Sequence, residues 1–272
     1  MAGKTPRKTP DYENNPFFIA TNGITMLFNL ARGAATLFIL LSVYTFFTKD
    51  DSSPREAKDR AERIADTVST WSFEQWLLAV GAFLAIILAL LMIYALLSGV
   101  SAYTSAELAK GKKVSLKRAF SIAFDNLWSY LWLQIIVYAK IIGWSLLLVV
   151  PGIYFAFRYS LAGVAFYDSD KNLRGNAAVK ESLRLTKNGW ITTFGSNMLF
   201  NLLTFGVLHS VVSTGVNAVL YKQFNAIGDK KPEAHWLSWL TLFFPFVVVV
   251  SLITSFVMLT LGIAVGEAIW PN

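Results

Sequence analysis

The stretch VVPGIYFAFRYSLA at residues 149–162 separates two apolar segments of the chain. Pro151 has no backbone N–H and clashes with a preceding helical turn, and Gly152 tolerates backbone angles that other residues resist. The pair therefore predicts a tight structural turn between two membrane-embedded helices. The shorter segment downstream of this turn carries one basic residue, Arg158.

The composition outside this stretch is that of a membrane protein. Hydrophobic residues make up 55% of the 272 positions, and charged residues only 15%, against about 25% in a soluble domain. Many of the nine Trp residues lie at the ends of apolar runs, as expected for interfacial belts. Cysteine is absent, which excludes disulfides and thiolate metal sites. The net charge of +7 is best explained by cytoplasmic loops and contact with anionic lipid headgroups, not by nucleic acid.

Run lengths predict an all-α, polytopic transmembrane helix bundle with about six spans and interfacial amphipathic helices. A span needs about 20 mostly apolar residues. The six predicted spans are residues 24–47, 76–100, 128–150, 152–167, 190–220 and 236–264. The fourth is short, and the last two are long enough that Gly206 and Pro245 are expected to interrupt or bend them. Residues 17–272 would form one membrane domain after a disordered cytoplasmic tail, residues 1–16.

The distribution of basic residues predicts the orientation. Six spans place the tail and the loops around residues 110–118 and 168–187 on one side, with thirteen Lys and Arg residues. The loops around residues 48–72 and 221–235 fall on the other side, with eight. Basic residues favour the cytoplasmic side, so both termini are predicted to be cytoplasmic in a multi-pass protein of the cell (plasma or inner) membrane.

Three segments outside the spans have helical amphipathic patterns. Residues 53–71 are predicted to form an extracytoplasmic amphipathic helix that lies against the bundle or the headgroups. Residues 115–124 and 177–186 are basic and amphipathic, and each precedes a predicted span. We expect these two to lie along the cytoplasmic membrane surface with their apolar faces toward the lipid. Their similarity suggests a weak internal repeat.

Three basic residues lie inside predicted spans, where a charge costs about 2.5–3.5 kcal/mol. They are Arg32, Lys140 and Arg158. One interpretation is that their long side chains snorkel to the interface. The alternative is a site for an anion or a lipid phosphate, which Lys140 favours because it lies about 18 Å along the helix from Trp128.

Polar residues also line one face of the fifth predicted span. Thr193, Asn197 and Asn201 recur every four residues, which predicts either interhelical hydrogen bonds or a polar substrate path. Gly262 and Gly266 form a small-xxx-small pair that favours close helix packing. We predict no catalytic site, no cofactor and no metal site, since His209 has no second ligand nearby in the sequence.

The segments around Pro151 and Trp190 resemble a known family. VPGIY at 150–154, RYSLA at 158–162 and AVKESLRLTK at 178–187 are similar to the membrane domain fused to some glycerophosphodiester phosphodiesterases, and to the related stand-alone YciC-like bacterial and archaeal membrane proteins. The resemblance covers mainly residues 128–201. It implies a prokaryotic six-span membrane protein. The soluble catalytic barrel of the phosphodiesterases, with its histidines and metal-binding carboxylates, has no counterpart here, so we expect no enzyme.

Two functions compete on these grounds. The first is a non-enzymatic module that binds lipids or supports another membrane or envelope protein, with anionic lipids, another membrane protein or a second copy as partners. The second is a transporter or lipid-translocating component for a polar or anionic substrate. Basic amphipathic segments favour the first, and the charged and polar residues within spans favour the second.

Overall fold

The computed structural model describes residues 12–47, 54–204, 206–230 and 233–243, together with residues 247, 254 and 257. These residues form helices and loops and contain no strand, so the predicted all-α class is confirmed for the described part of the chain. The helices are α1 (Pro16–Leu30), α2 (Arg32–Phe47), α3 (Pro54–Ser69), α4 (Phe73–Ala109), α5 (Leu116–Asp125), α6 (Leu127–Leu147), α7 (Val149–Arg158), α8 (Ala162–Tyr167), α9 (Asn176–Leu185), α10 (Trp190–Leu203) and α11 (His209–Ile227). Residues 236–243 are also helical.

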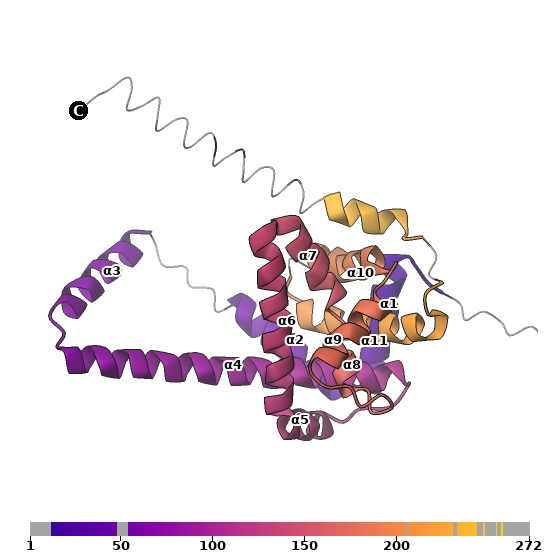
Figure 1. Ribbon diagram of the computed structural model, residues 1–272, viewed down its shortest axis with the longest axis horizontal. Coiled ribbons are helices and arrows are strands. Elements are labelled where there is room, and N and C mark those ends of the chain that lie inside the picture. Colours follow the sequence, from indigo (N-terminus) through magenta and orange to yellow (C-terminus); the bar gives the residue numbers. More distant parts are fainter. Residues whose placement is uncertain are drawn as a thin grey trace, which may run out of the picture.

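The helices form a bundle from which one arm projects (Figure 1). The bundle packs around α1, the second half of α4 and α11, whose side chains supply much of the buried core, such as Ile19, Leu27, Val100, Leu220 and Phe224. The arm consists of α3 and the first half of α4, and it extends away from the other helices.

The exposed half of α4 is the clearest membrane signal in the structure. No residue from 73 to 94 is buried, and the first buried residue of the helix is Ala95. At 1.5 Å per residue this half is about 33 Å long, which matches the thickness of about 30 Å of a bilayer core. A helix this apolar requires an apolar surrounding, and the described part of the chain does not bury this half of it.

Among the described residues, two helices, α4 and α6, are long and apolar enough to cross a membrane. The number rises to three if the bent pair α1 and α2 counts as one span. In Figure 1, α6 crosses α4 instead of running along it. Their contact is formed at the crossing, where the hydroxyl groups of Tyr94 and Tyr138 lie 2.6 Å apart.

The predicted span at residues 24–47 is not one helix. It is divided at Ala31, and the axes of α1 and α2 differ in direction by 116°. Ala31 leaves the helical region with φ −141° and ψ 50°, while the N–H of Val114 donates to the carbonyl of Leu30 at 2.8 Å. The loop after α4 therefore binds the carbonyl of Leu30, which would otherwise accept a hydrogen bond in a continuous helix. The composition of the segment does not reveal this contact.

The return after α6 occurs three residues earlier than predicted. Helix α6 ends at Leu147, Leu148 is extended, and α7 begins at Val149, so Pro151 and Gly152 lie within the first turn of α7. Proline is tolerated there because the first N–H groups of a helix have no intrahelical partner. A Cβ atom on Gly152 would lie 2.9 Å from that of Ser145, so the glycine allows α7 to pack closely on α6. The predicted fourth span, residues 152–167, is divided into α7 and α8.

The predicted span at residues 190–220 is a hairpin of α10 and α11. Gly206 has a φ of 77° and donates its N–H to the carbonyl of Asn201 at 2.7 Å, which ends α10 as the sequence suggested. The return brings the last turns of α11 back to the start of the chain, where the rings of Tyr12 and Phe224 stack.

The hairpin overturns the predicted side of the loop after α11. Asn225 accepts a hydrogen bond from Lys171, and the side chain of Asn14 donates to the carbonyl of Glu233 at 2.8 Å. Residues around 221–233 therefore lie with the N-terminal segment and the 168–187 loop, not opposite them. Hydropathy did not detect this turn inside an apolar run, and the described residues do not confirm the predicted six spans.

The three amphipathic segments are helical, but they do not all lie where predicted. In α3 the described residues 58–67 are exposed, and the helix lies at the end of the arm, away from the bundle. In α5, Ala119 and Ala123 are buried, and in α9, Ala178, Val179 and Leu185 are buried. Part of the apolar face of α5 and of α9 thus packs onto neighbouring helices of the bundle, while Phe124 of α5 is 67% exposed.

Parts of three predictions lie outside the described residues. They are residues 1–11 of the tail, most of the sixth span at residues 236–264, and the packing pair Gly262 and Gly266. The predicted disorder of residues 12–16 is wrong. Tyr12 stacks on Phe224, and Asn15 caps α1 by accepting the N–H of Phe17 at 3.0 Å.

Candidate binding cavity

A cavity of about 860 Å³ lies in the bundle among α2, α4, α6, α7, α8, α10 and α11. This volume falls within the range of about 300–1,000 Å³ typical of sites for small ligands. None of the described residues that line it is Lys, Arg, Asp or Glu. The cavity is therefore uncharged, and its chemistry depends on hydroxyl, amide and apolar groups.

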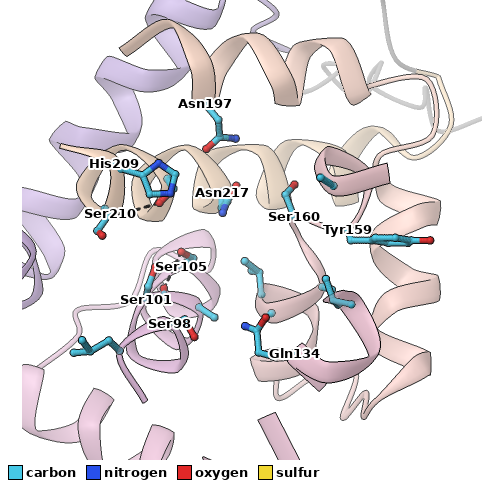
Figure 2. A pocket seen from close by; sticks show the side chains of 18 of the residues that line it. Ser98, Ser101, Ser105, Gln134, Tyr159, Ser160, Asn197, His209, Ser210 and Asn217 are labelled. Carbon is cyan, nitrogen blue, oxygen red and sulfur yellow. Dashed lines mark hydrogen bonds between the residues drawn. The ribbon is translucent and has the colours of Figure 1, made fainter. Parts of the chain in front are cut away.

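The lining is divided between polar and apolar residues. The polar part includes Ser98, Ser101, Ser105, Gln134, Asn197, Asn201, His209, Ser210, Ser213 and Asn217. The apolar part includes Phe38, Leu41, Leu97, Leu133, Val137, Ile141 and Phe157. Figure 2 shows Asn197 and Gln134 on opposite sides of the cavity, with Asn217 between them in this view, whereas Tyr159 points away. Such a cavity suits an amphiphilic molecule.

The predicted polar face of the fifth span reaches this cavity. Thr193, Asn197 and Asn201 lie on α10, and each bonds the backbone carbonyl four residues earlier: Gly189 at 3.0 Å, Thr193 at 3.0 Å and Asn197 at 2.6 Å. Asn197 and Asn201 line the cavity and Thr193 does not. These bonds are made within one helix, so the predicted interhelical bonding does not describe them.

These bonds also determine which atom each amide presents to the cavity. A backbone carbonyl accepts only from the NH₂ group, so Asn197 and Asn201 each commit one N–H to α10 and keep the second N–H and the amide oxygen. Gln134 does the same, because its Nε2 lies 2.8 Å from the hydroxyl of Tyr130. The side-chain oxygens of Asn201 and Asn217 are buried and have no hydrogen-bond partner in the described part of the chain.

The serine hydroxyls that line the cavity are committed in a similar way. Ser98, Ser105, Ser160 and Ser213 donate to backbone carbonyls. Ser101 pairs with Thr214 at 2.6 Å, and Thr214 already donates to the carbonyl of Ser210 at 2.6 Å, so Ser101 must be the donor of that pair. Five of the six lining serines therefore offer the cavity acceptor lone pairs and no proton. The exception is Ser210, which follows His209 in the first turn of α11.

None of the three predicted intramembrane cations lines the cavity. Arg32 is exposed at the first position of α2, directly after the bend, and Lys140 is exposed on α6. The position of Arg32 beside a helix break differs from the predicted site inside a continuous span. Lys140 remains a candidate for contact with lipid phosphates on the outer surface of α6.

Arg158 is used inside the protein. Its guanidinium donates to the carbonyl of Leu183 and, at 2.9 Å, to the hydroxyl of Tyr154. Its own carbonyl accepts from Ser182 at 2.7 Å and from Thr186 at 3.1 Å. Leu183 lies in the last turn of α9, where unpaired carbonyls favour a cation. Arg158 therefore joins α7 to α9, and its role as an anion site has no support in these contacts.

An ionic network closes the bundle one helical turn beyond the cavity. Lys110 pairs with Asp168 at 2.8 Å and with Asp170 at 3.2 Å, and Tyr221 donates to Asp168 at 2.7 Å. Each residue of the network lies four or five positions after a residue that lines the cavity. Lys110 follows Ser105, Asp168 follows Val164, and Tyr221 follows Asn217. The network thus joins the ends of α4, α8 and α11.

Glu181 anchors a second set of contacts at this end. It binds Arg184 through two hydrogen bonds of 2.8 Å and 2.7 Å, and its carboxylate also pairs with Lys171. The hydrogen bonds from Arg184, together with those from Lys171, outweigh burial and lower the pKa of Glu181 to about 2. Burial raises the pKa of Asp168, but the bonds from Lys110 and Tyr221 outweigh that effect, so its pKa is lowered.

Sequence reasoning did not identify the cavity. It found Asn197 and Asn201, and the spacing of Ser98, Ser101 and Ser105 at three and four residues was the one further signal, because it places them on one face of α4. Among the described residues no group of three or more His, Asp or Glu side chains could hold a metal ion.

Comparisons of the chain with protein-family models, curated proteins and solved structures find no match.

Proposed function

We propose that this chain is a non-enzymatic integral membrane protein that holds a membrane lipid in the cavity between α4, α6, α10 and α11. The observation that carries the proposal is the amphiphilic cavity, in which an uncharged polar surface faces an apolar wall. The unburied half of α4 supports a location in the bilayer. A lipid would place its headgroup among the amides and serines and an acyl chain along the apolar wall.

The resemblance to the membrane domain of glycerophosphodiester phosphodiesterases agrees with this proposal, and we propose relationship to that group as part of it. Basic residues on the surface, among them Lys117, Lys180 and Lys222, are exposed and would contact anionic headgroups around the protein.

Filling the cavity should displace the lipid. Ser213 lines the cavity, and a phenylalanine at this position would occupy space between α4 and α11. We expect Ser213→Phe to reduce the lipid retained by the purified protein about tenfold, measured by native mass spectrometry. Ser129→Phe is the matched control, because Ser129 is exposed on α6 outside the cavity. Equal lipid retention in the two variants would contradict the proposed function.

Translocation of a lipid is the second candidate, and the ionic network favours it. The network joins α4, α8 and α11 one turn beyond the cavity, where a gate would lie. In vesicles containing a fluorescent lipid, a translocating protein equilibrates the two leaflets and Ser213→Phe does not. A protein that only binds lipid leaves the leaflets unequal in both cases.

We further propose that the N-terminal segment and the end of α11 face the cytoplasm, and that α3 lies on the opposite side. Moving the 221–233 segment to the side of the 168–187 loop leaves only the acidic, mixed-charge region around α3 on the other side, which strengthens the charge bias. In place of about six spans, we propose that α2 and the exposed half of α4 cross the membrane. Two crossings keep the 168–187 loop and the end of α11 on the side of the N-terminal segment, and α6, which crosses α4 in Figure 1, is not a span in this topology.

This topology predicts an accessibility pattern. The chain has no cysteine, so single cysteines can be introduced without background labelling. We expect Lys180→Cys and Lys222→Cys to react with a membrane-impermeant maleimide from one side, and Arg60→Cys to react only from the other. All three positions are exposed. Labelling of position 222 together with position 60 would restore the original six-span arrangement.

A further inference from the structure

The cavity presents hydrogen-bond acceptors almost throughout. Gln134, Asn197 and Asn201 each use one N–H of the amide to bind another group of the protein, which leaves one N–H and the acceptor oxygen on each amide. Five lining serines donate their protons to carbonyls or to Thr214 and keep acceptor lone pairs. Acceptors therefore outnumber donors in the cavity, and a ligand that supplies donors satisfies more of them than a ligand that supplies only acceptors.

The buried side-chain oxygens of Asn201 and Asn217 favour a ligand that donates hydrogen bonds. Both atoms lack a hydrogen-bond partner in the described part of the chain. The oxygen assignment of Asn201 is determined by its environment, since only its nitrogen can donate to the carbonyl of Asn197. A buried acceptor without a partner is costly, and a ligand hydroxyl at this position removes that cost.

Charge narrows the class of ligand further. Among the described residues, no Lys or Arg lines the cavity to neutralise a phosphate, and no Asp or Glu lines it to pair with an ammonium group. A phosphate in this space would find only neutral N–H and O–H donors, and a charged group in a site of low polarity is unfavourable without a charged partner. Neutral hydroxyl groups satisfy the acceptors without either cost.

Resting on the proposed function, we propose that the bound molecule is a lipid with an uncharged, hydroxyl-rich headgroup, a glycerol or sugar joined to acyl chains. The hydroxyls donate to Gln134, Asn201 and Asn217, and the chains lie along the wall formed by residues such as Leu133 and Val137. The cavity and the protein surface then select different lipids: anionic headgroups contact the basic surface, and neutral polyol headgroups enter the cavity.

The test compares two probe lipids in one membrane. The protein is reconstituted in phosphatidylcholine nanodiscs that contain equal, small fractions of monoglucosyl-diacylglycerol and phosphatidic acid, and bound lipid is measured by native mass spectrometry. We expect about tenfold enrichment of the glucosyl lipid over phosphatidic acid, the ratio that one satisfied buried acceptor provides. Equal retention of the two lipids, or preference for phosphatidic acid, overturns the inference.

Two variants tie the selectivity to the cavity. Asn201→Leu should abolish the enrichment, while Asn176→Leu, an exposed asparagine on α9, should keep it. Gln134→Lys replaces an acceptor with a cationic donor and should reverse the preference toward phosphatidic acid. Thermal melting of each variant checks folding, and Gln134→Lys keeps the test valid if Asn201→Leu does not fold. An unchanged preference in a folded Gln134→Lys protein contradicts the inference.

Failure of the headgroup inference can be distinguished from failure of the proposed function. If Ser213→Phe displaces a lipid that proves to be phosphatidic acid or phosphatidylcholine, the protein binds lipid in the cavity and only the headgroup inference is wrong. If Ser213→Phe leaves lipid retention unchanged, the proposed function is wrong and the headgroup inference falls with it.

Discussion

Replacing Gly23 or Gly215 with alanine is expected to lower stability by about 3 kcal/mol, near the upper end of the cost of overpacking a core. The two glycines lie where α1 crosses α11. A Cβ atom on Gly23 would lie 2.6 Å from the carbonyl oxygen of Gly215, and one on Gly215 would lie 2.5 Å from that of Gly23. Real Cβ atoms do not approach backbone so closely, so the helices would have to separate. The measurement is thermal unfolding in detergent, followed by tryptophan fluorescence.

Glycines elsewhere provide the control for this prediction. A Cβ atom on Gly81 of α4 or on Gly143 of α6 meets nothing within 4 Å. Alanine at either position should be neutral or stabilising by up to about 1 kcal/mol, because glycine is a poor helix former. The double variant Gly23→Ala and Gly215→Ala should cost little more than one substitution, since one is enough to separate the helices. Full additivity of the two substitutions would show that they do not act at one contact.

The second large expected effect is a loss of stability at acidic pH. The pKa of Glu181 is about 2 in the folded protein, against its ordinary value of 4.5, because Arg184 and Lys171 bind its carboxylate. A carboxyl group whose pKa is lowered by folding stabilises the folded protein at pH values above its ordinary pKa. This contribution is lost as the pH falls from about 4.5 toward 2. The contribution is on the order of 2 kcal/mol, reduced from the full shift because Arg184 and Lys171 are partly exposed to solvent.

Glu181→Gln tests this contribution directly. At pH 7 the variant should be less stable than the original chain by about 2 kcal/mol, and most of the difference should be lost near pH 2, where Glu181 is protonated in the unfolded chain and about half protonated in the folded protein. Glu62→Gln is the control. Glu62 pairs with Lys58 at 3.8 Å on the exposed helix α3, and its removal should change stability by less than about 0.5 kcal/mol at any pH. A difference for Glu181→Gln that persists at pH 2 would falsify the proposed electrostatic origin.

Local patterns in the sequence were sufficient for helix type and for several helix positions. The run at residues 76–100 lies within α4, and the amphipathic run at residues 53–71 contains α3, because hydropathy and helical spacing depend only on neighbouring residues. Gly206 was expected to interrupt the fifth apolar run, and it ends α10. Asn197 and Asn201 were selected as a polar face, and both line the cavity.

Contacts between distant parts of the chain decided the rest. Val114 binds the carbonyl of Leu30 beside the bend between α1 and α2, and the α9 terminus engages Arg158, a residue that looked unpaired in the sequence. Hydropathy cannot distinguish an apolar face covered by lipid from one covered by protein, so α5 and α9 were assigned to the membrane surface although they pack on the bundle.

The sequence by itself determined that this protein is helical, apolar and basic, since each property is a sum over residues or over neighbours along the chain. The tertiary structure alone decided where the apolar runs bend and that seven helices line a cavity with no charged residue among its described lining. It also decided how the amides at the cavity are oriented, because the helix carbonyls and the Tyr130 hydroxyl each take one amide N–H, and the oxygen of Asn201 is left without a partner among the described residues.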